Sequence, residues 1–288
     1  MQLITTVEEM AARREEWRAA GKTVGLVPTM GYLHQGHLSL AERSRQENDL
    51  TVASIFVNPL QFGPKEDFGR YPRDLDRDLK LLESVGVAAV FHPEPSEMYP
   101  PGFDASVEVG GITGVLEGAA RPGHFKGVTT VVAKLFNIVG ARRAYFGQKD
   151  AQQVAVLRKM VRDLNFPLQL VVCPTMREPD GLAMSSRNVY LSPEERQAAP
   201  ALYRALQAAA QLWQERPDER SGPALRAAME NVLAGVPLGK ADYVSAADPL
   251  TLQEYAGAVP PGQGALLSMA VRFGSTRLID NMPLEGAG

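Results

Sequence analysis

Pro28-Thr-Met-Gly-Tyr-Leu-His-Gln-Gly-His-Leu-Ser-Leu40 is the stretch that decides how this chain folds. It follows the apolar run 24–27, which predicts a strand, and it leads into residues 38–47, which predict a helix. A strand, a glycine-bearing turn and a helix form the arrangement that aims backbone N–H groups at a phosphate. His34 and His37 add imidazole donors at this turn, although the chain has only four histidines. A short motif of this kind is also compatible with two surface histidines in an ordinary turn.

Strand-like and helix-like runs alternate outward from this stretch. The runs that predict strands are 23–27, 50–57, 88–91, 143–146 and 168–173. Those that predict helices are 38–47, 74–84, 127–139, with Gly140 at its end, and 151–164. This alternation predicts an α/β fold with a doubly wound, mainly parallel sheet. Ligands in such sheets bind beyond the carboxyl ends of the strands. We therefore expect the turns at His34, 58–61 and 147–150 to open on one crevice.

The pattern changes after about residue 175. Alanine-rich residues 193–215 and 222–234 predict helices, and short strands are predicted at 241–246, 265–271 and 276–280, the last two joined by a turn at Gly274-Ser275. We expect two domains, residues 1–175 and a smaller α+β domain of residues 176–288. The Pro- and Gly-rich residues 93–123 predict an ordered excursion with little regular structure.

Composition is that of an ordinary globular protein, with 45% hydrophobic and 22% charged residues among 288. The net charge of −3 gives no general attraction to nucleic acid or anionic membranes. No apolar run reaches membrane-spanning length and the N-terminus lacks a signal-peptide pattern, so we expect a cytoplasmic protein. The single cysteine, Cys173, lies in an apolar run and is expected to be a buried strand residue.

A second group of polar residues, Met184-Ser-Ser-Arg187, follows the charged turn 177–181. Two hydroxyls and a guanidinium in a row can bind phosphate oxygens, since arginine supplies paired planar donors. In isolation this group is more typical of an exposed polar loop.

Together the two groups resemble the HxGH and KMSKS signatures of the nucleotidylyltransferase superfamily. Longer stretches resemble the pantothenate synthetase (pantoate–β-alanine ligase) family, in the expected order: 28–37, 54–63, 71–73, 121–128, 145–153 and 180–188. The resemblance implies a Rossmann-like N-terminal domain, a smaller C-terminal domain, a homodimer formed through the N-terminal domains and a requirement for Mg²⁺. It also implies that ATP and pantoate form pantoyl adenylate and pyrophosphate, after which β-alanine displaces AMP to give pantothenate.

The resemblance further implies a set of site residues. The residues expected to bind ATP are Met30, Gly31, Tyr32, Leu33, His34, Gln35, Gly36, His37, Gly147, Gln148, Lys149, Asp150, Met176, Met184, Ser185, Ser186 and Arg187. Those expected to act in catalysis, mainly through position and positive charge, are His34, His37, Lys149, Ser185, Ser186 and Arg187. Gln61 and Gln153 match residues that hold pantoate, with Gln61 also expected at β-alanine. Asp78 matches an acidic residue near the magnesium ion, with contact expected through water.

Local chemistry leaves some alternatives open. Lys149 precedes a predicted helix, where a cation opposes the helix dipole, so its position favours an anion-binding role. Asp150 either caps this helix or contacts the nucleotide ribose. Gln148 replaces the glutamate that is more common in the family, and Arg121 and His124 match a family motif without an assigned role. Another HxGH adenylyltransferase acting on a phosphate-bearing substrate is the nearest alternative function, and an RNA-binding protein is disfavoured by the net charge.

Overall fold

The computed structural model describes residues 1–64 and 66–286, and within these residues the strands form two sheets. The chain divides into two compact units. Unit 1 consists of Met1–Gly147 and Gln153–Pro174, and unit 2 consists of Gln148–Gln152 and the chain from Thr175 onward. The five residues Gln148–Gln152 thus group with the C-terminal part of the chain, whereas the sequence placed them in the first domain.

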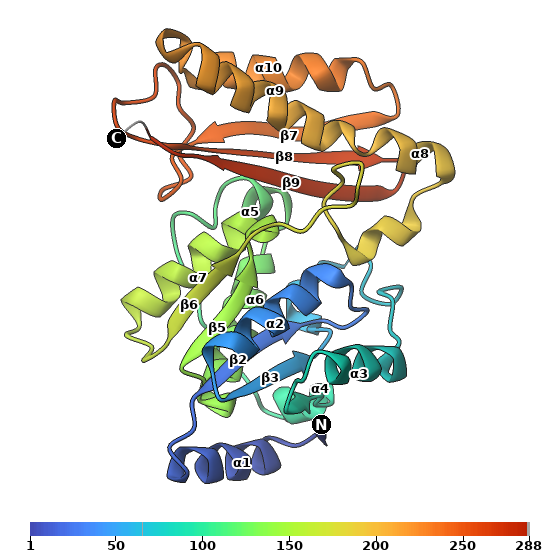
Figure 1. Cartoon of the computed structure of the whole chain (residues 1–288), viewed down its shortest axis with the longest axis vertical. Helices are drawn as coiled ribbons and strands as arrows, with labels where there is room; N and C mark the ends of the chain where they lie inside the picture. Colours follow the sequence, from blue (N-terminus) through green and yellow to red (C-terminus); the bar gives the residue numbers. More distant parts are fainter. Residues whose placement is uncertain (65, 287–288) are drawn as a thin grey trace. The chain divides into compact units, whose positions relative to one another are not determined.

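Unit 1 is built from parallel strands and the helices that connect them (Figure 1). Its strands are β1 (Gln2–Ile4), β2 (Val24–Thr29), β3 (Leu50–Ile55), β4 (Ala89–Phe91), β5 (Arg143–Gly147) and β6 (Gln169–Cys173). Its helices are α1 (Val7–Ala19), α2 (Gln35–Glu47), α3 (Leu75–Ser84), α4 (Pro95–Met98), α5 (Glu117–Ala120), α6 (His124–Val139) and α7 (Ala151–Asp163), with a 3-10 turn η1 (Pro59–Gln61). The first two residues of α7 group with unit 2.

The expected doubly wound parallel sheet is confirmed. Within the described residues the strand order is β1-β4-β3-β2-β5-β6, and every pair is parallel. From β2 the chain builds outward through β3 and β4, and then returns to the other side of β2 for β5 and β6. The direction of winding therefore reverses between β2 and β5, and ligands bind beyond the carboxyl ends of strands at such a reversal. The turns after β2 and β3 lie at this edge.

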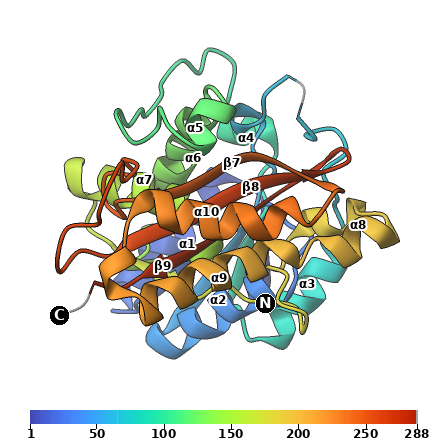
Figure 2. The same cartoon turned by 90° about the horizontal axis from the view of Figure 1, so that it is seen from above.

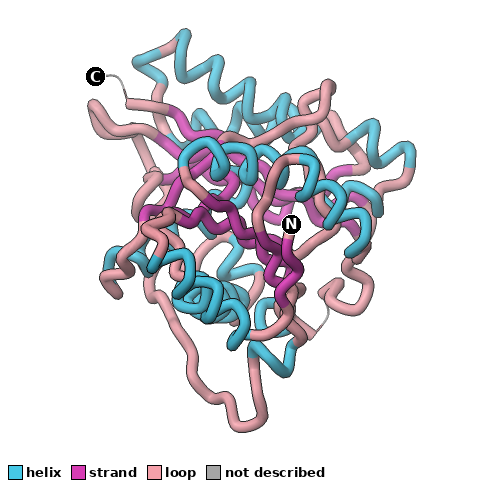
Figure 3. The backbone as a smooth tube through the Cα atoms, turned by 60° about the horizontal axis from the view of Figure 1, so that its bottom comes forward, coloured by secondary structure: helices cyan, strands magenta, loops and turns pink. Residues whose placement is uncertain are grey.

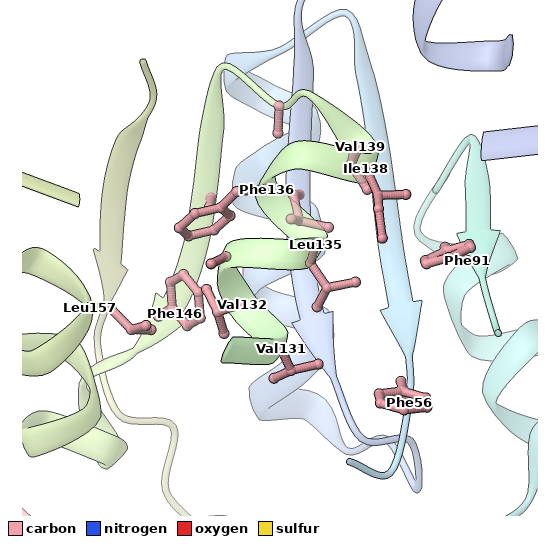
Figure 4. Packing of buried hydrophobic residues seen from close by; sticks show 14 of the residues in the cluster. Phe56, Phe91, Val131, Val132, Leu135, Phe136, Ile138, Val139, Phe146 and Leu157 are labelled. Atoms are coloured by element: carbon pink, nitrogen blue, oxygen red, sulfur yellow. The ribbon is translucent and has the colours of Figure 1, made fainter. Parts of the chain in front are cut away.

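The core of unit 1 gathers around α6, whose buried face includes Val132, Leu135 and Phe136. Figure 4 shows these side chains together with Phe146 of β5, whose ring centre lies 6.5 Å from that of Phe136. Burial of each such side chain stabilises the fold by roughly 1.5–3 kcal/mol. The helix begins one turn earlier than predicted, because Phe125 is the one apolar residue of its first turn and lies between His124 and Lys126. It ends at the predicted glycine, Gly140, which takes a left-handed conformation with φ +61°.

Unit 2 packs helices on an antiparallel sheet. Its helices are α8 (Pro193–Ala198), α9 (Ala201–Glu215) and α10 (Gly222–Ala234), its strands are β7 (Gly239–Ala247), β8 (Ala265–Phe273) and β9 (Thr276–Leu284), and its 3-10 turns are η2 (Gln148–Asp150), η3 (Ser186–Tyr190) and η4 (Pro217–Glu219). Within the described residues the strand order is β7-β8-β9. Figure 2 shows α9 and α10 side by side along these strands.

Several predicted elements are wrong in extent. The predicted helix 193–215 is two helices, because Pro200 has no N–H to donate and interrupts the ladder. Residues 93–123 contain only the short helices α4 and α5 among loops, as predicted, whereas β1 and α1 were not predicted. Figure 3 distinguishes the helices and strands from the loops that join them. The helix α1 gave little apolar signal because Met10 is its one buried residue.

Cys173 is buried at the end of β6, as expected, and burial raises the pKa of its thiol. None of the helices in the described ranges has the length and apolar character needed to cross a membrane.

Candidate active site

The turn between β2 and α2 is held in a left-handed conformation by a buried carboxylate. Gly31 has φ +82° and Tyr32 has φ +49°, which is unfavourable for a residue with a side chain. Asp78 of α3, only 1% exposed, accepts hydrogen bonds from the N–H groups of Tyr32 (2.6 Å) and Leu33 (2.8 Å). The expectation that this turn aims its backbone N–H groups at a phosphate is therefore wrong for these two residues.

The two histidines of the turn cap the helix that they begin. The N–H of Gly36 donates to Nδ1 of His34 (3.1 Å), and the N–H of His34 donates to Nδ1 of His37 (3.3 Å). Their ring centres are 4.1 Å apart. Because a backbone N–H can only donate, both Nδ1 atoms act as acceptors, and the proton of each neutral ring lies on Nε2. Each imidazole can thus donate a hydrogen bond through Nε2 to an anion without carrying a charge.

Asn58, in the turn after β3, has its side-chain amide fixed on both sides. Its Oδ1 accepts hydrogen bonds from the N–H of Leu60 (3.2 Å) and from the hydroxyl of Tyr99 (2.7 Å). Its Nδ2 donates to the carbonyl of Gly127 (3.1 Å) and to Oε1 of Gln61 (3.0 Å). Burial raises the pKa of Tyr99, so its hydroxyl stays a donor. The backbone partners leave one orientation for the Asn58 amide.

The orientation of Gln61 follows from that of Asn58. Because Oε1 of Gln61 accepts from Asn58, its Nε2 is turned the other way and lies 3.2 Å from Sδ of Met30. Met30 belongs to the turn that carries the two histidines. The structure therefore brings the predicted pantoate residue Gln61 into contact with a predicted nucleotide residue. Gln153, the other predicted pantoate residue, is the third residue of α7 and is partly buried.

His124 contacts the backbone of Gln61, and Arg121 contacts His124. Nδ1 of His124 lies 2.8 Å from the carbonyl oxygen of Gln61, and its Nε2 lies 3.1 Å from Nη1 of Arg121. Arg121 also donates two hydrogen bonds to Glu66, each 2.7 Å long. Burial, assisted by the charge of Arg121, lowers the pKa of His124 to about 4. His124 is therefore neutral at physiological pH, and Arg121 keeps a charged partner in Glu66.

Both carboxylate oxygens of Asp78 bind the turn, and the expected contact of Asp78 with magnesium through water stays a prediction. Burial raises the pKa of its carboxyl, and the hydrogen bonds from Leu33 and Tyr32 oppose this effect. Each carboxylate oxygen accepts one backbone N–H. Nothing among residues 1–64 and 66–286 groups three or more His, Cys, Asp or Glu side chains in a way that could hold a metal ion.

In unit 2, Asn281 of β9 holds the turn η2 that carries Lys149. Nδ2 of Asn281 donates to the carbonyls of Gln148 (2.9 Å) and Lys149 (2.8 Å), and its Oδ1 accepts from Nε2 of Gln148 (3.0 Å). Nζ of Lys149 lies 3.6 Å from the carboxylate of Asp150, and the two side chains are 21% and 46% exposed. The backbone of the turn is thus fixed by hydrogen bonds, while the side chain of Lys149 is partly exposed.

The loop from Met176 to Arg187 is anchored to the same strand. Arg177 donates two hydrogen bonds, 2.6 and 2.9 Å long, to Asp280 of β9, which is buried. The guanidinium also lies 4.0 Å from the ring centre of Tyr203. The N–H of Met184 donates to the carbonyl of Met176 (3.0 Å), which closes the base of the loop.

At the end of this loop, the predicted phosphate-binding residues begin the turn η3. Oγ of Ser185 accepts a hydrogen bond from the N–H of Arg187 (3.2 Å) and so caps the turn. Ser186 is buried, whereas Ser185 and Arg187 are partly buried. The Oγ of Ser185 keeps its proton for a further donor contact.

The structure divides the predicted nucleotide residues between the two units. Unit 1 contains Met30, Gly31, Tyr32, Leu33, His34, Gln35, Gly36, His37 and Gly147, and unit 2 contains Gln148, Lys149, Asp150, Met176, Met184, Ser185, Ser186 and Arg187. Sequence reasoning missed the residues that anchor these segments, above all Asp280 and Asn281. Their one signal was a pair of adjacent polar residues at the end of the predicted strand 276–280 and directly after it.

Comparisons with known proteins cover nearly the whole chain. The sequence matches the family described as pantoate-beta-alanine ligase over residues 2–283. It is 59% identical over 290 residues to the pantothenate synthetase of Chloroflexus aurantiacus (strain ATCC 29366 / DSM 635 / J-10-fl), covering 100% of both chains. A crystal structure of pantothenate synthetase from Thermus thermophilus is 52% identical with a TM-score of 0.91, over 98% of this chain and 99% of that one. The Francisella tularensis pantoate-beta-alanine ligase, solved in complex with beta-gamma ATP and beta-alanine, is 32% identical with a TM-score of 0.79, over 100% and 99%.

Proposed function

The chain belongs to the pantoate-beta-alanine ligase family, and from this premise we propose how its residues carry out the reaction. The activity is the ATP-dependent condensation of pantoate with β-alanine. In the proposed order, a carboxylate oxygen of pantoate attacks the α-phosphorus of ATP and pyrophosphate leaves. The amine of β-alanine then attacks the acyl carbon, loses a proton and displaces AMP.

The observation that carries this order is the contact between Gln61 and Met30. Nε2 of Gln61 lies 3.2 Å from Sδ of Met30, so the proposed acid-binding residue adjoins the proposed nucleotide-binding turn. An acid held at Gln61 would lie next to a nucleotide held along residues 30–37. Proximity of this kind converts a reaction between two substrates into one within a complex, which lowers the barrier by several kcal/mol.

His34 and His37 act on the phosphates as neutral donors in this proposal. Their Nδ1 atoms accept backbone hydrogen bonds, so a neutral ring donates to an anion through Nε2–H. The charge that builds on the α-phosphate and on the departing pyrophosphate is stabilised by such preorganised donors. A proton transfer from His37 is not required, because a hydrogen bond that strengthens in the transition state already supplies catalysis.

The remaining proposed nucleotide residues supply positive charge and hydroxyl donors. Lys149 presents an ammonium group from a turn whose backbone is fixed by Asn281. Arg187, Ser185 and Ser186 supply a guanidinium and two hydroxyls to phosphate oxygens. We propose that Met176 and Met184, which pair through their backbones, border the adenine.

Gln61 and Gln153 bind pantoate in this proposal, and Gln61 also contacts β-alanine. Because Oε1 of Gln61 already accepts from Asn58, Gln61 presents the N–H side of its amide. It therefore selects an oxygen acceptor on the substrate, a carboxylate or a hydroxyl. A neutral amide leaves the attacking carboxylate ionised without a tight ion pair that would lower its nucleophilicity.

Magnesium enters as part of the substrate MgATP, since Asp78 does not fit a direct ligand. Magnesium ions usually bind substrate phosphates with few protein ligands.

We also propose that two copies of the chain associate through their N-terminal parts. Light scattering on the purified protein would then give twice the mass of one chain. A cytoplasmic location stays a prediction from the sequence.

The test is to mix the purified protein with ATP, Mg²⁺, pantoate and β-alanine and to measure pantothenate and AMP. Without β-alanine, exchange of labelled pyrophosphate into ATP should depend on pantoate. Exchange that proceeds equally fast without pantoate would exclude the proposed order. A His37→Ala variant should lose on the order of a hundredfold in this exchange while keeping its fold.

A further inference from the structure

We propose that His124 is a positioning residue for pantoate, which acts by holding the backbone of Gln61. The inference rests on the proposed function, in which Gln61 binds pantoate. The motif 121–128 resembles the family, but the resemblance left His124 and Arg121 without a role. Their contacts in the structure supply one.

The hydrogen bonds of His124 define a single neutral tautomer. The carbonyl oxygen of Gln61 can only accept, so Nδ1 of His124 carries the proton and donates to it over 2.8 Å. Nη1 of Arg121 can only donate, so Nε2 of His124 accepts from it over 3.1 Å. A protonated ring would set an N–H against the guanidinium. The pKa of His124, lowered to about 4 mainly by burial, agrees with a ring that stays neutral.

Arg121 is itself held in place, so the ring cannot turn freely. Its Nε and Nη2 donate to the two carboxylate oxygens of Glu66, both over 2.7 Å. The side chains of Arg121 and Glu66 are only 19% and 25% exposed. Bidentate pairs of this kind fix both distance and orientation. Glu66, Arg121 and His124 thus form a chain of hydrogen bonds that ends on the carbonyl of Gln61.

The same helix fixes Gln61 at a second point. Gly127, one turn after His124 in α6, approaches so closely that a Cβ there would lie 2.2 Å from the carbonyl oxygen of Leu60 and 2.6 Å from the nitrogen of Gln61. The carbonyl of Gly127 also accepts from Asn58, which in turn binds the side chain of Gln61. The first turn of α6 therefore supports both the backbone and the amide of Gln61.

Two substitutions separate the bonds that His124 makes. In His124→Asn the amide lies at the position of Nδ1 and can still donate to Gln61, whereas the bond to Arg121 is lost. In His124→Gln the amide lies at the position of Nε2, which keeps a partner for Arg121 and loses the donor to Gln61. If His124 acts through Gln61, the Asn variant retains pantoate binding and the Gln variant loses it.

The experiment measures the dissociation constants of pantoate and of MgATP, by titration, for both variants and for Gln61→Ala. We expect His124→Gln to weaken pantoate binding about tenfold, the effect of one hydrogen bond. His124→Asn should change it less than about threefold, and MgATP binding should stay within about twofold in every variant that folds. In a Gln61→Ala background, His124→Gln should add less than about twofold, because the residue through which it acts is gone.

Each contrary result has a separate meaning. Equal losses of pantoate binding in the Asn and Gln variants, or a tenfold loss that persists in the Gln61→Ala background, would overturn the positioning role of His124. Unchanged pantoate binding in Gln61→Ala alone would instead overturn the proposed role of Gln61, and with it the premise. MgATP binding reports whether each variant is folded, so a misfolded variant is not counted as support.

Discussion

Replacing Asp78 by asparagine should loosen the turn that carries the two histidines. Asparagine keeps the shape of the side chain but can accept with only one of its two terminal atoms. Its NH₂ group would face the N–H of Tyr32 or of Leu33, which now lie 2.6 and 2.8 Å from the carboxylate oxygens. The turn would lose a charge-assisted hydrogen bond, and its left-handed Tyr32 would lose the contact that holds it.

The size of the effect follows from opposing contributions. Loss of a hydrogen bond to a charged group costs about 1.5–3 kcal/mol, and a left-handed residue such as Tyr32 stores about 1–2 kcal/mol that a loosened turn releases. Burial raises the pKa of Asp78, so a neutral amide recovers part of the cost of burying the charge. We expect a net loss of about 1–2 kcal/mol in the free energy of unfolding. We also expect a slower pyrophosphate exchange, because His34 and His37 lie directly after the loosened residues.

Urea unfolding and pantoate-dependent pyrophosphate exchange are the two assays. Asp76→Asn is the matched control, since Asp76 lies on the same helix but is exposed, and it should change neither quantity. The exchange is measured over a range of Mg²⁺ concentrations. If excess Mg²⁺ restores Asp78→Asn to full activity, Asp78 is a magnesium ligand and the reasoning is wrong. Unchanged stability and activity would refute it as well.

Three further predictions concern other contacts. Burial and the charge of Arg121 lower the pKa of His124 to about 4 in the folded protein, although Glu66 and Glu117 act in the opposite direction, against about 6.5 in the unfolded chain. Between these values the unfolded chain gains a proton that the folded chain does not, so His124 alone should lower the free energy of unfolding by about 3 kcal/mol from pH 6.5 to 4. In urea titrations over this pH range, His124→Asn should therefore show a smaller fall than the unchanged protein. Gly127→Ala should raise the KM for pantoate and destabilise the fold by about 1–3 kcal/mol, because its Cβ meets backbone, whereas Gly110→Ala, which has open space, should do neither. Asn281→Ala should slow pyrophosphate exchange at least tenfold by freeing the turn of Lys149, and an unchanged rate would show that this anchor is dispensable.

The sequence predicted the elements whose signal is local. Apolar runs located β2, β3, β5 and β6, and Gly140 located the end of α6, because burial and left-handed conformation each demand particular residue types. The predicted helix 193–215 failed because alanine-rich composition outweighed Pro200 in the interpretation. The motif 28–37 predicted the two histidines as site residues, because it occurs with the other family motifs in the expected order.

The support of the site could not be predicted, because it depends on contacts between residues far apart in the chain. Asp78 binds the N–H groups of residues 45 and 46 positions away, and a run of acidic residues at a helix start gave no hint of this. The tautomers of His34 and His37 follow from backbone bonds that only the folded turn shows. The fixed amide of Gln61 depends likewise on Tyr99, which lies in a stretch without regular periodicity.

The anchor of Lys149 has a consequence for how the protein is made. Asn281 follows Gln148 by 133 residues, so a ribosome must add all of them before the turn η2 acquires the amide that binds its two carbonyls. Until then the surrounding strands of the parallel sheet can pair, but the ammonium group lacks a fixed backbone. Contacts of such long separation form late in folding, because closing the intervening loop lowers the entropy of the chain before the contact contributes any stabilising energy. A nascent or C-terminally cleaved chain would therefore lack the anchor of η2, on which the proposed role of Lys149 depends.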